Sequence, residues 1–289
     1  MPSSSTPALT HISDTARWVA YYRAMESDRP DALFRDPYAR QLAGEQGETI
    51  VRTLPKGRAF AWPMIVRTAL LDELILRAVQ RDGVDTVVNL AAGLDTRPYR
   101  LALPRSLKWI DADLPAMIEY KQEVLARETP SCTLESVKID LTDPARRAAF
   151  FHQVGGTARQ ALVVTEGLLI YLTREQVSAL ARDVHRPTSF RWWLIDLASP
   201  RLLKLMERTW SKPLQAAGAP FQFAPAEGTK FFEPLGWREV EWRPMFHESV
   251  RLNRSMRMAR FWLFVARFYT QRMQEEFRRM SGVAMLERQ

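Results

Sequence analysis

The sequence predicts an α/β fold in which strands and helices alternate around a parallel sheet. Between residues 84 and 197, short apolar runs alternate with stretches of helical spacing. Such alternation is typical of parallel strands joined by crossover helices. The first apolar run passes directly into Ala91, Ala92 and Gly93, whose small size lets the backbone approach a ligand closely. We therefore expect a ligand site where this strand ends.

The N-terminal section, residues 1–82, is predicted to be helical and to act as a lid. Asp14 or Thr15 can cap a first helix, and residues 65–76 have the apolar spacing of another that ends near Gly83. The first ten residues have neither a basic start nor an apolar core, so no signal peptide is predicted.

Five strands are expected between residues 84 and 197, and several of them lead into an acidic residue. The apolar runs and their acids are 87–90; 109–113 with Asp111 and Asp113; 137–141 with Asp140; 161–165 followed by Glu166; and 191–196 with Asp196. Parallel strands present their carboxyl ends at one edge of a sheet, which is where ligands bind in such folds.

Two further segments interrupt and complete this pattern. Residues 198–230 are rich in proline around a helical piece at 202–210, which predicts a cap insertion. Residues 237–244 and 282–288 read as a terminal pair of strands, with a helical insertion at about 246–280 in which 256–279 is helical. This insertion carries an aromatic and apolar stripe of Phe261, Trp262, Phe264, Val265, Phe268 and Tyr269. The stripe favours packing in the core or in a dimer surface over a membrane anchor, although a basic amphipathic helix leaves a membrane anchor as an alternative.

Composition favours a cytoplasmic enzyme and excludes several other classes. The single cysteine, Cys132, allows no internal disulfide, and the four histidines show no metal-ligand spacing, so no metal is predicted. No window reaches the ~18 apolar residues of a membrane span. The net charge of +8 is spread over helices with acids between the arginines, which argues against nucleic acid and for a solvated surface. The excess of positive charge suits an anionic small substrate.

The first loop also separates two kinds of nucleotide ligand. A dinucleotide needs glycines at G-x-G-x-x-G spacing, whereas Gly93 stands alone here. Asp113 follows twenty positions later and is placed to accept hydrogen bonds from ribose hydroxyls. It could instead cap the helix that begins near Pro115, and Asp140 and Asp143 could likewise be caps. A nicotinamide-dependent oxidoreductase and a non-catalytic binding protein remain alternatives from other classes.

Four motifs in this order resemble the leucine carboxyl methyltransferase family, in particular its bacterial members linked to polyketide O-methylation. They are LAAGLDTR at 90–97, ADLP at 112–115, the pair Asp140–Leu141, and EGLLIYL at 166–172. The resemblance implies a class I methyltransferase, Rossmann-like sheet of five parallel strands plus an antiparallel terminal pair. Residues 83–289 would form this methyltransferase domain, and a homodimer is possible for such a chain.

The same resemblance implies a cofactor and a set of residues that would bind it. The cofactor would be S-adenosylmethionine, and the acceptor a small molecule, anionic or aromatic. The expected activity is O-methylation of a carboxylate to a methyl ester, with a phenolic hydroxyl of an aromatic polyketide as the alternative. No catalytic residue is assigned. The cofactor-binding residues would be Arg67 at the carboxylate, Ala91 and Gly93 beneath the methionine part, Asp113 at the ribose, Asp140 and Leu141 at adenine, and Glu166 at the methionine end, with Arg23 as a further basic candidate.

The chain departs from the family pattern at one glycine of the first loop. Ala91 stands where the pattern has glycine. We expect this exchange to be tolerated provided that the position does not need a positive φ.

Overall fold

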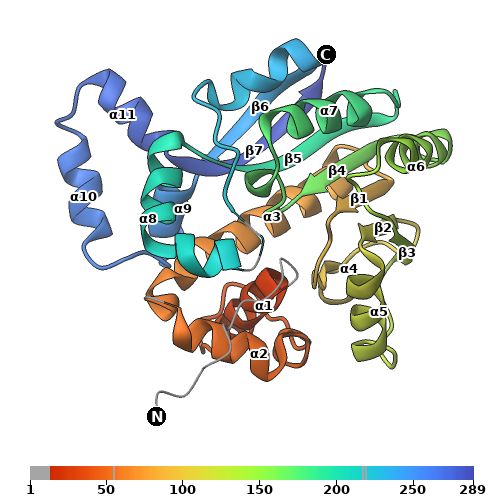
Figure 1. The fold of residues 1–289 in the computed structure, drawn as a ribbon, viewed down its shortest axis with the longest axis horizontal. Helices are drawn as coiled ribbons and strands as arrows, with labels where there is room; N and C mark the ends of the chain where they lie inside the picture. The colour runs from red at the N-terminus through yellow and green to blue at the C-terminus, as the bar shows by residue number, and fades with distance from the viewer. Residues whose placement is uncertain (1–13, 55, 217, 219) are drawn as a thin grey trace.

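A seven-stranded sheet forms the centre of the molecule (Figure 1). The computed structural model describes residues 14–54, 56–216, 218 and 220–289; the N-terminal ten residues and His11 lie outside this part. The strands are β1 (Thr86–Leu90), β2 (Lys108–Asp113), β3 (Thr133–Lys138), β4 (Ala161–Thr165), β5 (Phe190–Ala198), β6 (Trp237–Pro244) and β7 (Ser281–Arg288). Their order is β3-β2-β1-β4-β5-β7-β6. Strands β1 to β5 are parallel, and β7 runs antiparallel to both β5 and β6, which confirms the predicted sheet.

The central strands are apolar because helices cover both faces of the sheet. Every residue of β1 and β4 is buried. Alternate side chains enter different cores: Val88 belongs to the core that includes residues of α6 (Pro144–Thr157), α7 (Arg174–His185) and the 3-10 helix η3 (Gly228–Leu235), and Val87 belongs to the core that includes residues of α3 (Ala61–Arg81) and α9 (Met245–Arg251). The sheet is thus the middle of three layers.

The N-terminal helices form a separate core beside the carboxyl ends of the strands. Helices α1 (Asp14–Ser27) and α2 (Ala39–Thr53) pack on each other and precede the short helix η1 (Gly57–Phe60). Their apolar residues pack against Leu94, in the loop after β1, and against Met117 on α5 (Pro115–Val124). This section, predicted to be helical, therefore contacts the loop that was expected to meet a ligand.

The structure corrects two boundaries that were predicted from the sequence, one of a helical segment and one of a strand. The remaining helices are α4 (Arg97–Arg100), η2 (Leu169–Tyr171), α8 (Pro200–Ala216), α10 (Ala259–Ala266) and α11 (Gln271–Arg278). The prediction of one helix over 256–279 was wrong, because α10 ends at Ala266 and α11 begins only after Thr270, whose hydroxyl oxygen caps α11 by accepting from the Met273 amide at 3.3 Å. The third strand ends at Lys138 and not at 141, so Asp140 lies beyond it.

The aromatic stripe of residues 261–269 is largely exposed. Phe264 and Phe268 are 54% and 76% exposed, and Phe261 and Trp262 are each 49% exposed. Of the two alternatives predicted for this stripe, core or dimer surface, the core was therefore wrong. Among the described residues, no helix combines the length and the apolarity that crossing a bilayer requires.

Candidate functional site

A cavity of about 1460 Å³ lies at the carboxyl ends of the parallel strands. Residues at or just beyond the ends of β1, β2, β4 and β5 line it, together with α1, α3 and α8. All the sequence-predicted site residues are in its wall: Arg67, Ala91, Gly93, Asp113, Asp140, Leu141, Glu166 and the further candidate Arg23. Single ligand pockets are usually about 300–1,000 Å³, so this cavity has room for two small molecules.

The turn after β1 brings backbone to the cavity wall in a left-handed conformation. Ala91 has φ 51° and Gly93 has φ 52°. The condition under which alanine was expected to be tolerated at this position is therefore not met. A Cβ atom at Gly93 would lie 3.3 Å from the Cβ atom of Ala16 on α1, so glycine suits this position for both backbone and packing reasons.

Asp113 ends β2 and is held against this turn. One carboxylate oxygen accepts from the Gly93 amide at 2.6 Å, and the other accepts from the Leu114 amide at 2.7 Å. Helix α5 has Leu114 as its N-cap residue, without a side-chain cap, so the helix-cap interpretation of Asp113 was wrong. Burial raises the pKa of Asp113 above its ordinary value.

Asp140 and Leu141 lie in the turn between β3 and α6. The Asp140 carboxylate accepts from the amide and the hydroxyl of Thr142, at 2.8 and 2.7 Å, and these hydrogen bonds lower its pKa. The helix cap is Asp143, whose side chain accepts from the amides of Ala145 and Arg146. Asp140 is therefore not the cap of α6, and the residue lines the cavity.

Glu166, which directly follows β4, meets Arg67 of α3. The Arg67 Nε atom donates to Glu166 at 3.0 Å, and its Nη1 atom donates to Asp196 at 3.1 Å. Asp196 also accepts from the Gly167 amide at 2.7 Å. A Cβ atom at Gly167, which has φ 64°, would lie 3.2 Å from the guanidinium. The small residue after Glu166 thus leaves space for Arg67.

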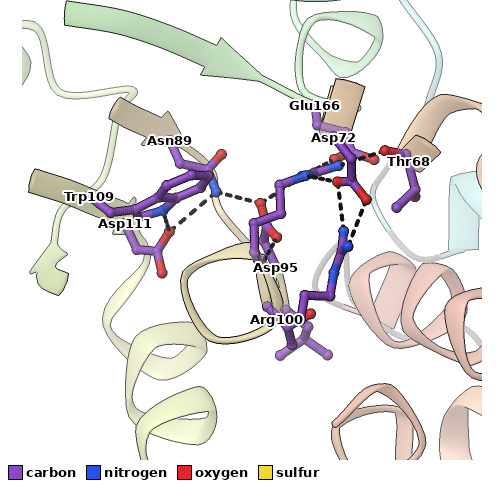
Figure 2. A network of polar contacts seen from close by, with 12 residues as sticks. Thr68, Asp72, Asn89, Asp95, Arg100, Trp109, Asp111 and Glu166 are labelled. Carbon is purple, nitrogen blue, oxygen red and sulfur yellow. Dashed lines mark hydrogen bonds and ion pairs between the residues drawn. The ribbon is translucent and has the colours of Figure 1, made fainter. Parts of the chain in front are cut away.

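Arg97 links Glu166 to the first loop in a buried network, whose acids Asp72, Asp95 and Glu166 are labelled in Figure 2. Its guanidinium pairs with Asp72 at 2.7 Å, Asp95 at 2.7 Å and Glu166 at 2.8 Å. The nearby cations, Arg97 first for both acids, lower the pKa values of Asp95 and Glu166 despite burial. Figure 2 shows Arg100 paired with Asp72, at 2.6 and 2.7 Å.

The same network reaches β2 through an amide side chain. Asn89 donates to Asp95 at 3.0 Å and to Asp111 at 3.2 Å (Figure 2). Asp111 also accepts from the indole of Trp109 at 2.9 Å and pairs with Lys121 at 2.7 Å. Strands β1 and β2, the loop between β1 and α4, and helix α3 are therefore connected by charged hydrogen bonds, which are stronger than neutral ones.

Arg23 also makes polar contacts on this side of the cavity. It pairs with Asp36 at 2.8 Å and donates to the carbonyl oxygen of Leu94 at 2.5 Å. Asp36 accepts in turn from the Thr96 hydroxyl at 2.6 Å. Arg23 thus fixes the loop after β1 from the side of α1.

The cavity wall away from these charges is apolar and aromatic. Its residues there include Trp18, Trp62, Leu202, Leu205, Met206, Phe221, Phe223, Phe246, Met256, Trp262, Tyr269 and Phe277. Arg201 at the start of α8 also lines the cavity, and it has no ion pair with any residue that the structure describes. This part of the wall suits an apolar molecule with a negative charge.

Other reactive groups lie elsewhere. None of the described histidines, His152, His185 and His247, lines the cavity. Cys132 is buried, and burial raises the pKa of its thiol to about 11, as expected for an inert cysteine. Within the part of the chain that the structure describes, no group of three or more potential ligands suits a metal ion.

Sequence reasoning missed three residues of this site. Asp196 follows the rule that a strand leads into an acid, yet it was given no role. Arg97 and Asp95 belong to the quoted LAAGLDTR motif, whose pattern contained the signal. The pairing of Arg97 with Glu166 and Asp72 could not be inferred from spacing, because those partners are distant in the chain.

Comparisons with known proteins agree on one family and one fold. A family model described as leucine carboxyl methyltransferase matches residues 16–185. Proteins of Streptomyces coelicolor and Mycolicibacterium smegmatis, each named "Putative S-adenosyl-L-methionine-dependent methyltransferase", are 38% and 37% identical over 57% and 60% of this chain. In each case the match covers 62% of the relative, so the chain spans about three fifths of the curated relatives' length.

Two solved structures share the fold across almost the whole chain. A DUF574 family protein of Streptomyces avermitilis has a TM-score of 0.61 at 12% identity, covering 98% of this chain and 99% of its own. A protein of Thermobifida fusca, titled a putative methyltransferase, has a TM-score of 0.57 at 13% identity, covering 98% and 96%. The fold is therefore that of class I methyltransferases, as the sheet order indicates.

Proposed function

The chain belongs to the leucine carboxyl methyltransferase family, and we propose that it is an S-adenosylmethionine-dependent O-methyltransferase that esterifies a carboxylate of a small molecule. The observation that carries this proposal is the convergence of the predicted cofactor residues on one cavity, beside an apolar chamber that Arg201 also lines. Family membership argues against the nicotinamide-dependent oxidoreductase.

The charged end of the cavity fits the methionine part of the cofactor. That part is a zwitterion, with a carboxylate and an ammonium group close together. Arg67 would take the carboxylate, while Glu166 and Asp196, which already pair with this guanidinium, would take the ammonium. A mixed group of one cation and two acids suits a zwitterion better than a simple anion.

The turn and the two following acids fit the nucleoside part. The backbone of Ala91 and Gly93 would pass beneath the methionine chain, and Asp113 would accept from ribose hydroxyls. For this, the carboxylate of Asp113 must use acceptor capacity beyond its two backbone hydrogen bonds, which a carboxylate with four lone-pair sites has. Asp140 and Leu141 would lie at adenine, where the side chain of Leu141 supplies an apolar surface.

Catalysis of this kind needs positioning more than proton transfer. Bound S-adenosylmethionine supplies an electrophilic methyl group on a positively charged sulfur. Arg201 would orient an anionic acceptor, and the aromatic residues around it would exclude water. A carboxylic acid with a pKa near ~4 is already ionised at neutral pH, so the absence of histidine from the described cavity wall fits a carboxylate acceptor.

Aromatic residues of the chamber, including Trp62, Phe221 and Phe246, favour a second candidate, the phenolic hydroxyl of an aromatic compound. The two can be separated by the product. The protein is incubated with a metabolite extract and methyl-labelled cofactor, and the labelled products are treated with alkali. A methyl ester releases labelled methanol, whereas an aryl methyl ether keeps its label, and that result would favour the phenolic acceptor.

A further inference from the structure

The segment 256–270, which includes α10, exposes large apolar side chains that the fold leaves uncovered. They are Met256, Met258, Phe261, Trp262, Phe264 and Phe268, and each is 46–76% exposed. Figure 1 places α10 at the periphery of the molecule, away from the sheet. Contiguous exposed apolar residues of this kind mark a surface that binds another apolar surface.

The charge of this segment selects among the surfaces that could cover it. Arg257, Arg260 and Arg267 are exposed, and none has an ion pair with a described residue; the segment contains no Asp or Glu. In a two-fold dimer through this patch, the same arginines would face each other, and like charges oppose association. An anionic surface is complementary instead.

We propose that the segment 256–270 docks on an anionic lipid bilayer surface. Its aromatic side chains enter the boundary between headgroups and acyl chains, while the three arginines contact lipid phosphates. This is peripheral docking and requires no membrane-spanning helix.

The docking surface adjoins the cavity. Met256 and Trp262 are half exposed and also line the cavity, as does Leu205 of α8, which is 57% exposed. A molecule that leaves the bilayer at this surface therefore meets the apolar chamber first. This step rests on the proposed function: the methyl acceptor is then an amphiphile that partitions into lipid.

Vesicle co-sedimentation of the full chain tests the docking. Vesicles of phosphatidylcholine and phosphatidylglycerol in equal amounts should bind the protein, and vesicles of phosphatidylcholine alone should bind it much more weakly. The double variant Phe264→Ser with Phe268→Ser should lower the partition coefficient at least about tenfold. Arg260→Gln and Arg267→Gln should lower it roughly fivefold each. Val240→Ser, which changes an exposed apolar residue on β6, is the matched control and should bind as the parent does.

Equal binding to both kinds of vesicle, or full binding by the aromatic double variant, would overturn the proposal. So would a dimer in solution that becomes a monomer only in that variant, because a second copy would then cover the surface. Neither Phe264 nor Phe268 lines the cavity, so calorimetry with S-adenosylmethionine on the same variants checks the proposed function separately. Loss of vesicle binding with cofactor binding retained separates the two proposals.

Discussion

Replacing Ala91 with glycine should stabilise the protein. Ala91 has φ 51° in the turn after β1, and the left-handed conformation costs an L-residue about 1–2 kcal/mol. Glycine pays no such cost, but its greater freedom in the unfolded chain offsets about 0.4–1 kcal/mol. The expected net gain in the free energy of unfolding is about 0.5–1 kcal/mol, which corresponds to about 1–3 °C in melting temperature.

Denaturant titration of Ala91→Gly measures this gain, and the next residue provides the control. Ala92 is buried and is not among the residues with positive φ. Ala92→Gly should therefore destabilise the protein by about 0.5–1 kcal/mol. If Ala91→Gly destabilises the protein as much as Ala92→Gly does, the strain assigned to this turn is refuted.

Three further outcomes are expected. Asp113→Ala should weaken S-adenosylmethionine binding by roughly 1.5–3 kcal/mol in a folded protein, as measured by calorimetry, and unchanged affinity would contradict the ribose role. Because the pKa of Asp113 is raised, the affinity of the parent protein should fall as acidification protonates this carboxylate. Arg97→Leu should destabilise the protein by about 3–5 kcal/mol because it leaves buried acids without their cation. The control Arg159→Ala breaks an ion pair whose arginine side chain is 88% exposed, and it should cost no more than about 1 kcal/mol. Equal losses of stability would refute the structural role of the network. Once an acceptor is identified, kcat should vary little between about pH 6 and 8. None of the variants His11→Ala, His152→Ala, His185→Ala and His247→Ala should show the ~10²-fold loss of kcat that is expected when a general base is removed. A steep pH dependence that disappears in one of them would favour the phenolic acceptor.

The sheet and the cavity residues could be predicted because their signals are local. An apolar strand that runs into Ala91–Gly93, or into Glu166, is visible within ten residues of sequence. The parallel order then brings those strand ends to one edge, whatever lies between them.

What could not be predicted depends on distant contacts or on backbone geometry. Arg97 looks like any surface arginine until α3 supplies Asp72 and β4 leads to Glu166. The conformation of Ala91 is set by the turn and not by its own preference. The break between α10 and α11 was missed because the apolar spacing continues across it, while the cap that starts α11 is one hydroxyl, that of Thr270.

The charged network around Arg97 has a consequence for how this chain can evolve. Its guanidinium serves three carboxylates, which are placed on three separate parts of the fold. A change at any one of these positions alters what the others require, so their mutational effects will not add. We therefore expect Arg97 and its three carboxylates to tolerate substitution only together, whereas the residues of the apolar chamber, which take no part in these ion pairs, can change one at a time. The geometry of the first loop would then be preserved independently of acceptor choice.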